Sequence, residues 1–351
     1  MAVKRGGEMA NIRDVAKKAG VSVATVSRVL NHPNTVSPTT MEYVLSVIKE
    51  LNYTPNGLAR SLALNKTNTI ALLIPNILNP LYMEIAKGVE DVAHKKGYST
   101  LLCNTEENPK KEADYIDMLI KRRVDGLILT ASLLNKEEIQ QIKKQDITFV
   151  MIGKSKNAKH ESVVFTDYVL GGYLATKHLI EIGYKRIAHI SGAVHQIENQ
   201  EKRAGYEKAL KENNLPIDKR YIVEGNNEIE GGYLAAKKLL QLKCKPEAIF
   251  VANDLMAFGA IDAIKSEGLR IPEDIAIVGF DNIEMSALVE PKLTTVSQPA
   301  YKMGLLSARL LFDHIENGDD EEHVHQEIFL QPKLKVRKSC GHEERVKEIF
   351  S

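Results

Sequence analysis

The sequence predicts an α/β protein with a small helical unit at its N-terminus and a larger body of alternating strands and helices. From Thr69 onward, short apolar runs recur, and each is followed by a helical stretch. The runs are apolar throughout, which is typical of parallel strands that are covered by helices on both faces. Repeated strand–helix units of this kind predict a doubly wound body. Because about 270 residues are many for one such sheet, we expect two similar lobes.

The overall composition is that of a globular protein. Of 351 residues, 44% are hydrophobic and 26% are charged, and no apolar run approaches the roughly 20 residues that cross a bilayer. The segment "MAVKRGGEMANIRD" lacks the apolar core of a signal peptide, so we expect a cytoplasmic protein. The three cysteines, Cys103, Cys244 and Cys340, have no metal-ligand spacing and are expected to be free thiols.

The helical unit is expected to contain three short helices. Gly20 ends the first helix and permits a tight turn into the second, as in a helix-turn-helix. Pro38 suits the first position of the third helix, which is expected to run to about Leu51. Each helix follows a residue whose side chain can cap it, and these residues are Asn11, Ser22 and Ser37.

The second helix has an unusual surface. Val26, Val29 and Leu30 fall on one face and suit a core, whereas the other face carries small side chains and one arginine, Arg28. Small side chains allow close approach to base edges in the DNA major groove, and an arginine can contact guanine with two hydrogen bonds, worth roughly 1–3 kcal/mol of discrimination. The alternative is an ordinary helical unit with an incidental arginine. The residues predicted to contact bases or phosphates are Ser22, Val23, Ala24, Thr25, Ser27, Arg28 and Asn31.

The charge of the chain is unevenly distributed. Residues 1–66 contain nine basic and four acidic residues, a net charge of +5, and the remainder carries −4, although the whole chain has only +1. A basic end on an acidic body points to a polyanionic partner for that end. A basic tail that only improves solubility would show the same asymmetry.

Polar residues follow several strands of the predicted body. Because ligands bind beyond the carboxyl ends of strands in open α/β sheets, these residues are candidates for a small-molecule site. Two lobes that close on a ligand would bring such groups together. For Asp254 and Asp281, capping of the following helix or turn is the alternative. The candidates at strand ends are Asn79, Asp167, Asn253, Asp254 and Asp281, and Arg203 opens the helix after "ISG".

The stretch "NIRDVAKKAGVSVATVSRVLNHPNTVSPTTMEYVLSVIKELNYTPNGLARSLA" closely resembles the headpiece of the lactose-repressor (LacI/GalR) family of bacterial transcription regulators. The resemblance continues in "IALLIPNILNPLY", "VDGLIL", "VANDLMAFGAIDAIKSEGLRIPEDIAIVGFDN" and "LTTVSQP". It implies a helix-turn-helix headpiece, a hinge helix and a two-lobed body like that of periplasmic binding proteins. It also implies a homodimeric transcriptional regulator, most often a repressor, on a pseudo-palindromic operator.

The resemblance also implies how the chain divides into domains. An N-terminal extension covers 1–9, the headpiece 10–54 and the hinge with its linker 55–66. The body covers 67–340, with the first lobe at about 67–167 and 299–328 and the second at about 168–298 and 329–340; 341–351 form a tail. Because the resemblance begins no earlier than Met9, which follows "RGGE", we expect Met9 to be the natural start.

In this family the hinge enters the minor groove, where a leucine unstacks a base step and bends the duplex. The matching leucine here is Leu62, and Asn56 and Ala59 lie in the same segment. Packing of Leu62 against its own headpiece is the alternative. The resemblance therefore adds Asn56, Ala59 and Leu62 to the predicted DNA-binding residues.

The resemblance also bears on the small-molecule site. Arg203, Asn253 and Asp281 match ligand-contacting positions of the family, and Asp167, Tyr82 and Phe250 match more variable ones. Tyr82 and Phe250 could instead be core aromatics. The effector remains open among a sugar, a sugar phosphate and a nucleobase.

One branch of the family binds a phosphorylated carrier protein on its outer face. At the equivalent outer face, this chain has Tyr301 and Arg309, which could contact such a partner. Lys302 stands where that branch tends to have an acid, which argues against such a partner.

Two other classes of protein are alternatives to a transcriptional regulator. A periplasmic solute-binding protein would share the two-lobed body but not the basic headpiece. An enzyme is not expected, because the chain has no G-x-G-x-x-G after the first strand, no P-loop, no G-x-S-x-G and no H-E-x-x-H. His323 and His325 lack a third ligand, so neither a metal nor a cofactor is expected.

Overall fold

The computed structural model describes residues 10–31, 33–53, 66–155, 157, 161–317 and 325–341, without the side chains of residues 31 and 33. The chain divides into two units, Met1–Thr67 and Asn68–Ser351, which are described separately. The predicted hinge residues Asn56, Ala59 and Leu62, like Met9 and His323, lie outside the described residues.

The described residues of the N-terminal unit form three α-helices and one short 3₁₀ helix: α1 (Ile12–Ala19), α2 (Val23–Asn31), η1 (Pro33–Thr35) and α3 (Pro38–Glu50). The predicted caps are confirmed. The side chain of Asn11 accepts hydrogen bonds from the backbone N–H groups of Arg13 and Asp14. The side chain of Asp14 in turn accepts from the backbone N–H of Asn11. Ser22 Oγ accepts from the backbone N–H of Thr25 at 3.1 Å, and Ser37 Oγ accepts from that of Thr40. Gly20 ends α1 with a φ of +65°, a conformation that glycine adopts without strain.

A small apolar core holds these helices together. Val26 and Val29 of α2 are 0% and 4% exposed, and Leu30 packs partly buried against the same cluster. The apolar face predicted for this helix is therefore confirmed. The fully or largely buried members from all three helices are Val15, Ala16, Ala19, Val26, Val29, Val44 and Val47.

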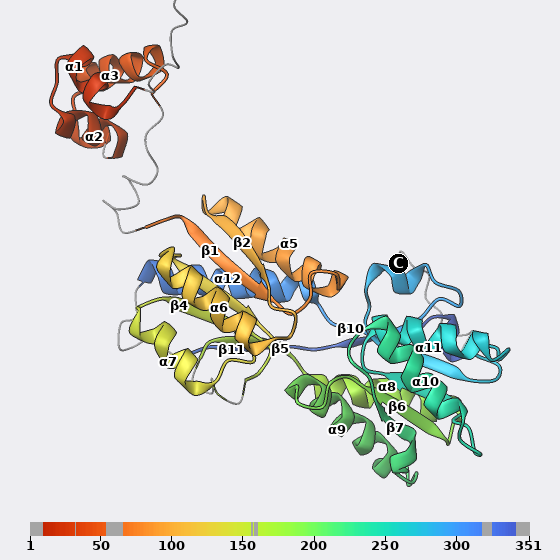
Figure 1. Cartoon of the computed structure of the whole chain (residues 1–351). Helices are drawn as coiled ribbons and strands as arrows, with labels where there is room; N and C mark the ends of the chain where they lie inside the picture. The colour runs from red at the N-terminus through yellow and green to blue at the C-terminus, as the bar shows by residue number, and fades with distance from the viewer. Residues whose placement is uncertain are drawn as a thin grey trace, which may run out of the picture. The chain divides into compact units, whose positions relative to one another are not determined.

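The body contains two six-stranded sheets with helices on both faces (Figure 1). The first sheet has the order β11-β5-β4-β3-β1-β2 and is parallel throughout. Its strands are β1 (Thr69–Ile74), β2 (Ser99–Asn104), β3 (Gly126–Thr130), β4 (Thr148–Ile152), β5 (Val163–Thr166) and β11 (Glu327–Leu330), and its helices are α5 (Pro80–Lys95), α6 (Pro109–Lys121), α7 (Lys136–Lys144) and α12 (Ala300–Asn317).

The second sheet has the order β12-β10-β9-β8-β6-β7, and only its edge strand β12 runs antiparallel. Its strands are β6 (Ile187–Ser191), β7 (Ile222–Glu224), β8 (Ala248–Val251), β9 (Ala276–Asp281), β10 (Thr294–Ser297) and β12 (Lys333–Lys335). The accompanying helices are α8 (Tyr168–Ile182), α9 (Ile197–Glu212), α10 (Ile229–Leu240) and α11 (Asp254–Ser266), with the 3₁₀ helices η2 (Lys219–Tyr221), η3 (Glu284–Ala287) and η4 (Lys338–Cys340).

The apolar strands are buried on both faces, as predicted. In β1, Ile70, Leu72 and Ile74 pack into one hydrophobic cluster, and Ala71 and Leu73 pack into another on the opposite face of the sheet. Successive side chains of a strand point to opposite faces, so an entirely apolar strand needs cover on each. The predicted doubly wound, two-lobed α/β body is thereby confirmed.

The chain passes between the lobes in three segments, residues 166–168, 297–300 and 330–333. These crossings connect β5 to α8, β10 to α12 and β11 to β12. Among the described residues, no helix is both long and apolar enough to span a membrane.

Three pairs of helices pack backbone to backbone through glycines. A Cβ added at Gly172 of α8 would lie 2.1 Å from the carbonyl oxygen of Lys202 on α9, and one at Gly205 would lie 2.1 Å from that of Val169. Such a distance is shorter than any tolerated contact, so these helices approach as closely as they do only because both positions lack a side chain. The same reciprocal arrangement joins α5 to α12 through Gly88 and Gly304, and α10 to α11 through Gly232 and Gly259.

Candidate DNA-reading helix and effector cleft

The outward face of α2 is small and carries one long cation. Val23 is 42% exposed, and Ala24 and Arg28 are also exposed, whereas Val26 and Val29 face the core. Because α2 is fixed from behind by this core and at its start by a cap, its outer side chains have defined positions. Such a face fits the major groove closely.

The remaining predicted contact residues of α2 lie around this face. Ser22 is exposed, and its hydroxyl lies 2.9 Å from that of Thr25, which is half-buried. Ser27 is half-buried as well. Asn31 is the last residue of α2, and its side chain lies outside the described part of the chain.

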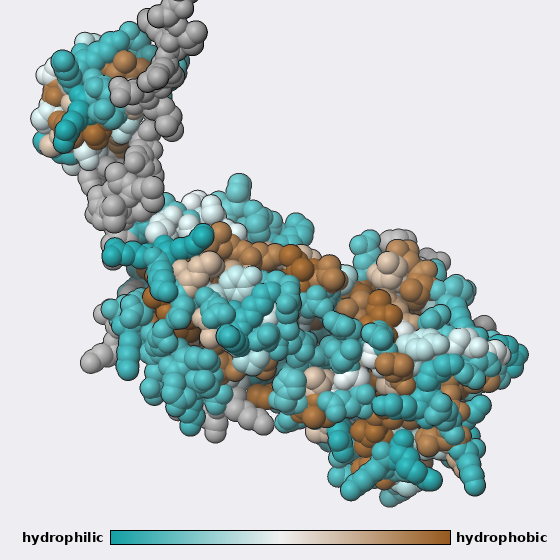
Figure 2. Space-filling view, in the orientation of Figure 1, coloured by the Kyte–Doolittle hydropathy of each residue, from teal (hydrophilic) through white to brown (hydrophobic). Residues whose placement is uncertain are grey.

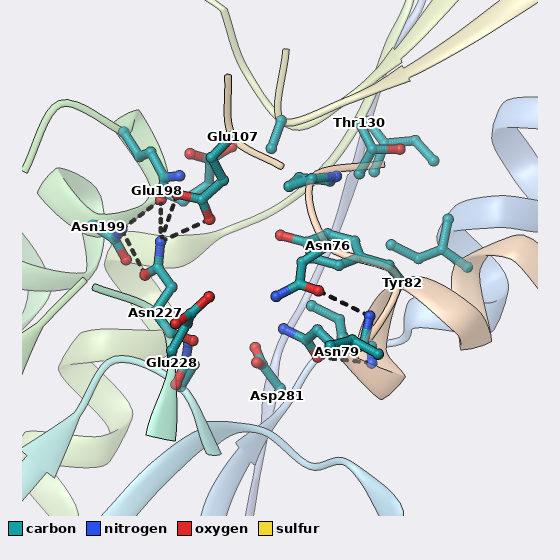
Figure 3. Close-up of a pocket in the computed structure, with 18 of the residues that line it drawn as sticks. Asn76, Asn79, Tyr82, Glu107, Thr130, Glu198, Asn199, Asn227, Glu228 and Asp281 are labelled. Atoms are coloured by element: carbon teal, nitrogen blue, oxygen red, sulfur yellow. Dashed lines mark hydrogen bonds between the residues drawn. The ribbon is translucent and has the colours of Figure 1, made fainter. Parts of the chain in front are cut away.

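A cleft of about 480 Å³ lies between the two sheets of the body. It opens where strands of both sheets end, since it includes residues that follow β1, β2, β3 and β8 and the last residue of β9. Figure 3 shows polar side chains of both lobes pointing toward one another across it. The lining consists of Pro75, Asn76, Ile77, Leu78, Asn79, Leu81, Tyr82, Ile85, Asn104, Glu106, Glu107, Thr130, Ala131, Ile152, Tyr168, Gln196, Glu198, Asn199, Lys202, Asn226, Asn227, Glu228, Asn253, Asp281, Gln298 and Met303.

Four of the predicted effector residues line this cleft: Asn79, Tyr82, Asn253 and Asp281. Two of them also begin helices. The side-chain oxygen of Asn79 accepts from the backbone of Leu81 at 3.0 Å, and that of Asn253 accepts from Met256 at 2.8 Å. Each helix cap therefore fixes an amide at the cleft.

The other three predicted effector residues do not line the cleft. Asp167 caps α8 by accepting from the backbone of Leu170 at 2.8 Å. Phe250 is fully buried and stacks on His189 with a ring-centroid distance of 4.7 Å, as its reading as a core aromatic predicts. Arg203 does not line the cleft, and its Nε donates to Oε1 of Glu207 at 2.9 Å.

Lys202 takes the inward position next to Arg203. Because neighbours on a helix point about 100° apart, only one of the two can face the cleft. Lys202 is 6% exposed, its Nζ donates to the backbone oxygen of Ala252 at 2.9 Å, and it lies 4.3 Å from the ring centroid of Phe280. Burial lowers the pKa of Lys202, and Asp281 and Glu198 counteract this effect. The sequence "EKR" shows two neighbouring cations, Lys202 and Arg203. It does not show which of them the rotation of α9 places at the cleft.

Asp281 combines burial with an unusual backbone. Its φ is +114°, a region that non-glycine residues rarely adopt, and it is 5% exposed. One carboxylate oxygen accepts from Nε2 of Gln298 at 2.6 Å. Burial raises the pKa of Asp281 from 3.8 to about 7, whereas Lys202 acts to lower it. Strain held at a cleft residue is typical of a functional position.

Asp254 has a structural position behind the cleft. Its carboxylate accepts from the hydroxyls of Ser286 and Thr295, each at 2.6 Å, and from the backbone of Ile283 at 3.0 Å. It thus ties α11 to the segment after β9 and to β10. Burial raises the pKa of Asp254 to about 6. The helix cap itself is Asn253.

Two polar contacts join the lobes beside the cleft. Lys154 of the first lobe pairs with Glu201 on α9 at 2.9 Å. The amide of Asn227 donates to Glu107, from the other lobe, at 3.1 Å (Figure 3). These contacts stabilise the relative orientation of the lobes described here.

The described residues contain no group of three or more His, Cys, Asp or Glu side chains that could hold a metal ion. Cys103, Cys244 and Cys340 are free thiols, as predicted, and only Cys244 is exposed.

Comparison with known proteins places both units in one family. Residues 11–56 match the family described as bacterial regulatory proteins, lacI family. Residues 67–334 match the periplasmic binding proteins and sugar binding domain of the LacI family.

Similar proteins cover nearly the whole chain. The HTH-type transcriptional repressor PurR of Aliivibrio salmonicida is 39% identical over 332 residues, covering 94% of this chain and 99% of the relative. PurR of Haemophilus influenzae is 40% identical over 333 residues, with 94% and 98% covered.

Solved structures show the same architecture. The lac repressor dimer bound to operator and the anti-inducer ONPF has a TM-score of 0.84 at 27% identity, covering 95% of this chain and 99% of that one. The complex of the transcriptional regulator CelR with cellobiose has a TM-score of 0.72 at 32% identity, with 94% and 99% covered. A regulator from Enterococcus faecium with bound ribose has a TM-score of 0.70 at 33% identity, with 77% and 98% covered. The chain therefore belongs to the LacI family and is a DNA-binding transcriptional regulator.

Proposed function

We propose that the chain is a homodimeric repressor that reads a pseudo-palindromic operator with α2 and is controlled by a small polar molecule in the cleft. The observation that carries this proposal is the exposed small-residue face of α2, with Arg28 on it, above a fully packed rear face. We infer that Arg28 contacts guanine and that Val23 and Ala24 contact thymine methyl groups. A regulator that acts on the chromosome works in the cytoplasm.

The dimer is supported by an exposed apolar surface on the body. Leu78, Met285 and Leu288 are 84%, 52% and 67% exposed, and Ile283, beside η3, packs in one cluster with Leu81 of α5. Figure 2 shows hydrophobic surface along α5 and on the adjacent edge of the second lobe. Large exposed apolar side chains that gather in this way mark interaction surfaces. The similar lac repressor structure is described as a dimer.

The ligand is supported by the chemistry of the cleft. Amide, hydroxyl and carboxylate groups from both lobes converge in it, which suits a molecule rich in hydroxyl groups. Two similar structures are described with cellobiose and with ribose. We therefore infer a sugar or a sugar derivative as the effector. Because the ligand contacts both lobes, it acts through its different affinity for two lobe arrangements.

The test begins with selection of binding sites from a random duplex library by the full-length chain. The selected site should be an inverted repeat. Arg28→Ala should weaken binding to it by about tenfold or more and relax the preference at one base pair of each half-site. Arg220→Ala serves as control, because Arg220 is an exposed arginine of the body that pairs with Asp218. Selection of no common sequence, or equal losses for both variants, would contradict the proposal.

A further inference from the structure

Carboxylates dominate the charged groups of the cleft. Lys202 is the one basic side chain among the described residues that line it. Figure 3 shows Glu107, Glu198, Glu228 and Asp281 directed into the same space. The five acidic lining residues are Glu106, Glu107, Glu198, Glu228 and Asp281.

Most of these carboxylates lack a basic partner. Glu106 pairs with Lys111 at 2.8 Å, outside the cleft lining. Within the described residues, none of the other four forms a salt bridge: Glu107 is bound by the neutral amide of Asn227, and Asp281 by that of Gln298. Glu198 lies against Gly153 of the opposite lobe, and burial raises its pKa, an effect that Lys202 partly counteracts. The cleft therefore contains more carboxyl groups than its one ammonium group can pair with.

Lys202 cannot compensate for it alone. One of its three N–H groups is used by the backbone oxygen of Ala252, and its ammonium lies over the rings of Phe280 and Tyr168. It is held at the wall formed by the second lobe. Carboxylates at the opposite wall, such as Glu107, face no cation within the described lining.

A separate observation is a buried polar group without a partner at the cleft wall. Thr130, the last residue of β3, is 6% exposed, and its hydroxyl has no hydrogen-bond partner. It lines the cleft on the side of the first lobe (Figure 3). A buried hydroxyl without a partner costs free energy unless a bound group satisfies it.

We propose that the effector of this chain carries a protonated amine among its hydroxyl groups, as an amino sugar does, and that the cleft discriminates against phosphorylated sugars. This inference rests on the proposed function of the cleft. When the lobes close, water leaves, and carboxylates without a counter-ion become unfavourable. An ammonium offsets their charge and donates three hydrogen bonds, whereas a neutral hydroxyl donates one and offsets no charge. A phosphate would add like charge and leave the acids unpaired.

The test measures binding of a panel of ligands to the full-length chain. Each set in the panel has the same sugar in a neutral, a positively charged and a negatively charged form. Glucose, galactose and mannose are each compared with the 2-amino sugar and the 6-phosphate, by calorimetry and thermal shift at one ionic strength. At least one amino sugar should bind about tenfold more tightly than its neutral parent, and no 6-phosphate should bind as tightly as its parent. A neutral sugar or a phosphate that binds most tightly, or the failure of every amino sugar to bind, would overturn the proposal.

A pair of variants separates the charge effect from folding. Glu198→Gln keeps the shape of the side chain and should weaken the preference for the amine. Glu212→Gln makes the same change at the other end of α9, where Glu212 pairs with Lys208 on the surface, and should retain it. An equal preference in both variants would contradict the inference. Operator selection by the same preparations, with and without each compound of the panel, tests the proposed function separately.

Discussion

Asp281 unites a strained backbone, a buried charge and a position in the cleft. Burial raises its pKa to about 7, so near neutral pH the folded protein retains a proton that the unfolded chain, with its ordinary pKa of 3.8, has lost. The contribution of this group to stability is therefore present at low pH and is lost as the pH rises through about 7. In the proposed function, the carboxyl group of Asp281 both titrates near neutral pH and contacts the ligand.

We expect the free energy of unfolding to fall by about 1 kcal/mol between about pH 6.5 and pH 8, and Asp281→Asn to flatten this dependence. Asp254, with a pKa of about 6, adds little in this window. His189 is buried, and its pKa is lowered to about 3 from 6.5, so its contribution still rises slightly above pH 6.5, but equally in wild type and variant. Urea unfolding at a series of pH values measures the effect. The same slope in wild type and variant would show that Asp281 is ionised throughout.

At the scale of elements, helix ends and sheet strands could be predicted because their signals are local. Asn11, Ser22 and Ser37 cap the helices expected of them, and the apolar run of β1 is buried on both faces. Apart from Asp281, the charged lining of the cleft could not be predicted in this way. Lys202 depends on the rotation of α9, and Glu107 and Glu228 come from loops whose course the sequence pattern does not determine.

The glycine contact between α8 and α9 positions Lys202 and Glu198. Gly172→Ala would bring a Cβ to 2.1 Å from the backbone oxygen of Lys202, so α9 must move away. We expect a loss of about 1–3 kcal/mol in the free energy of unfolding, with weaker ligand binding. Denaturant unfolding and calorimetry measure the two effects. Unchanged stability would mean that the helices separate without loss of packing.

At the scale of the whole molecule, the exposed apolar surface should hold two copies together. Leu288→Asp should dissociate the dimer, because it places a charge in an apolar interface, while the free energy of unfolding of the monomer stays the same. Phe329→Asp is the control, because Phe329 is 58% exposed on β11, the edge strand of the first sheet. Sedimentation equilibrium distinguishes the two variants. If both remain dimeric, the dimer uses another surface.

The proposed function requires that a ligand bound in the cleft changes the affinity of the chain for its operator. The most direct measurement is the Kd of the full-length chain for its selected operator, at one salt concentration, with and without the panel compound that binds most tightly. We predict a change of about tenfold or more in the wild type. In Asp281→Ala, we predict the same Kd without the compound and no response to it. A wild-type Kd that is unaffected while the compound occupies the cleft would contradict the account.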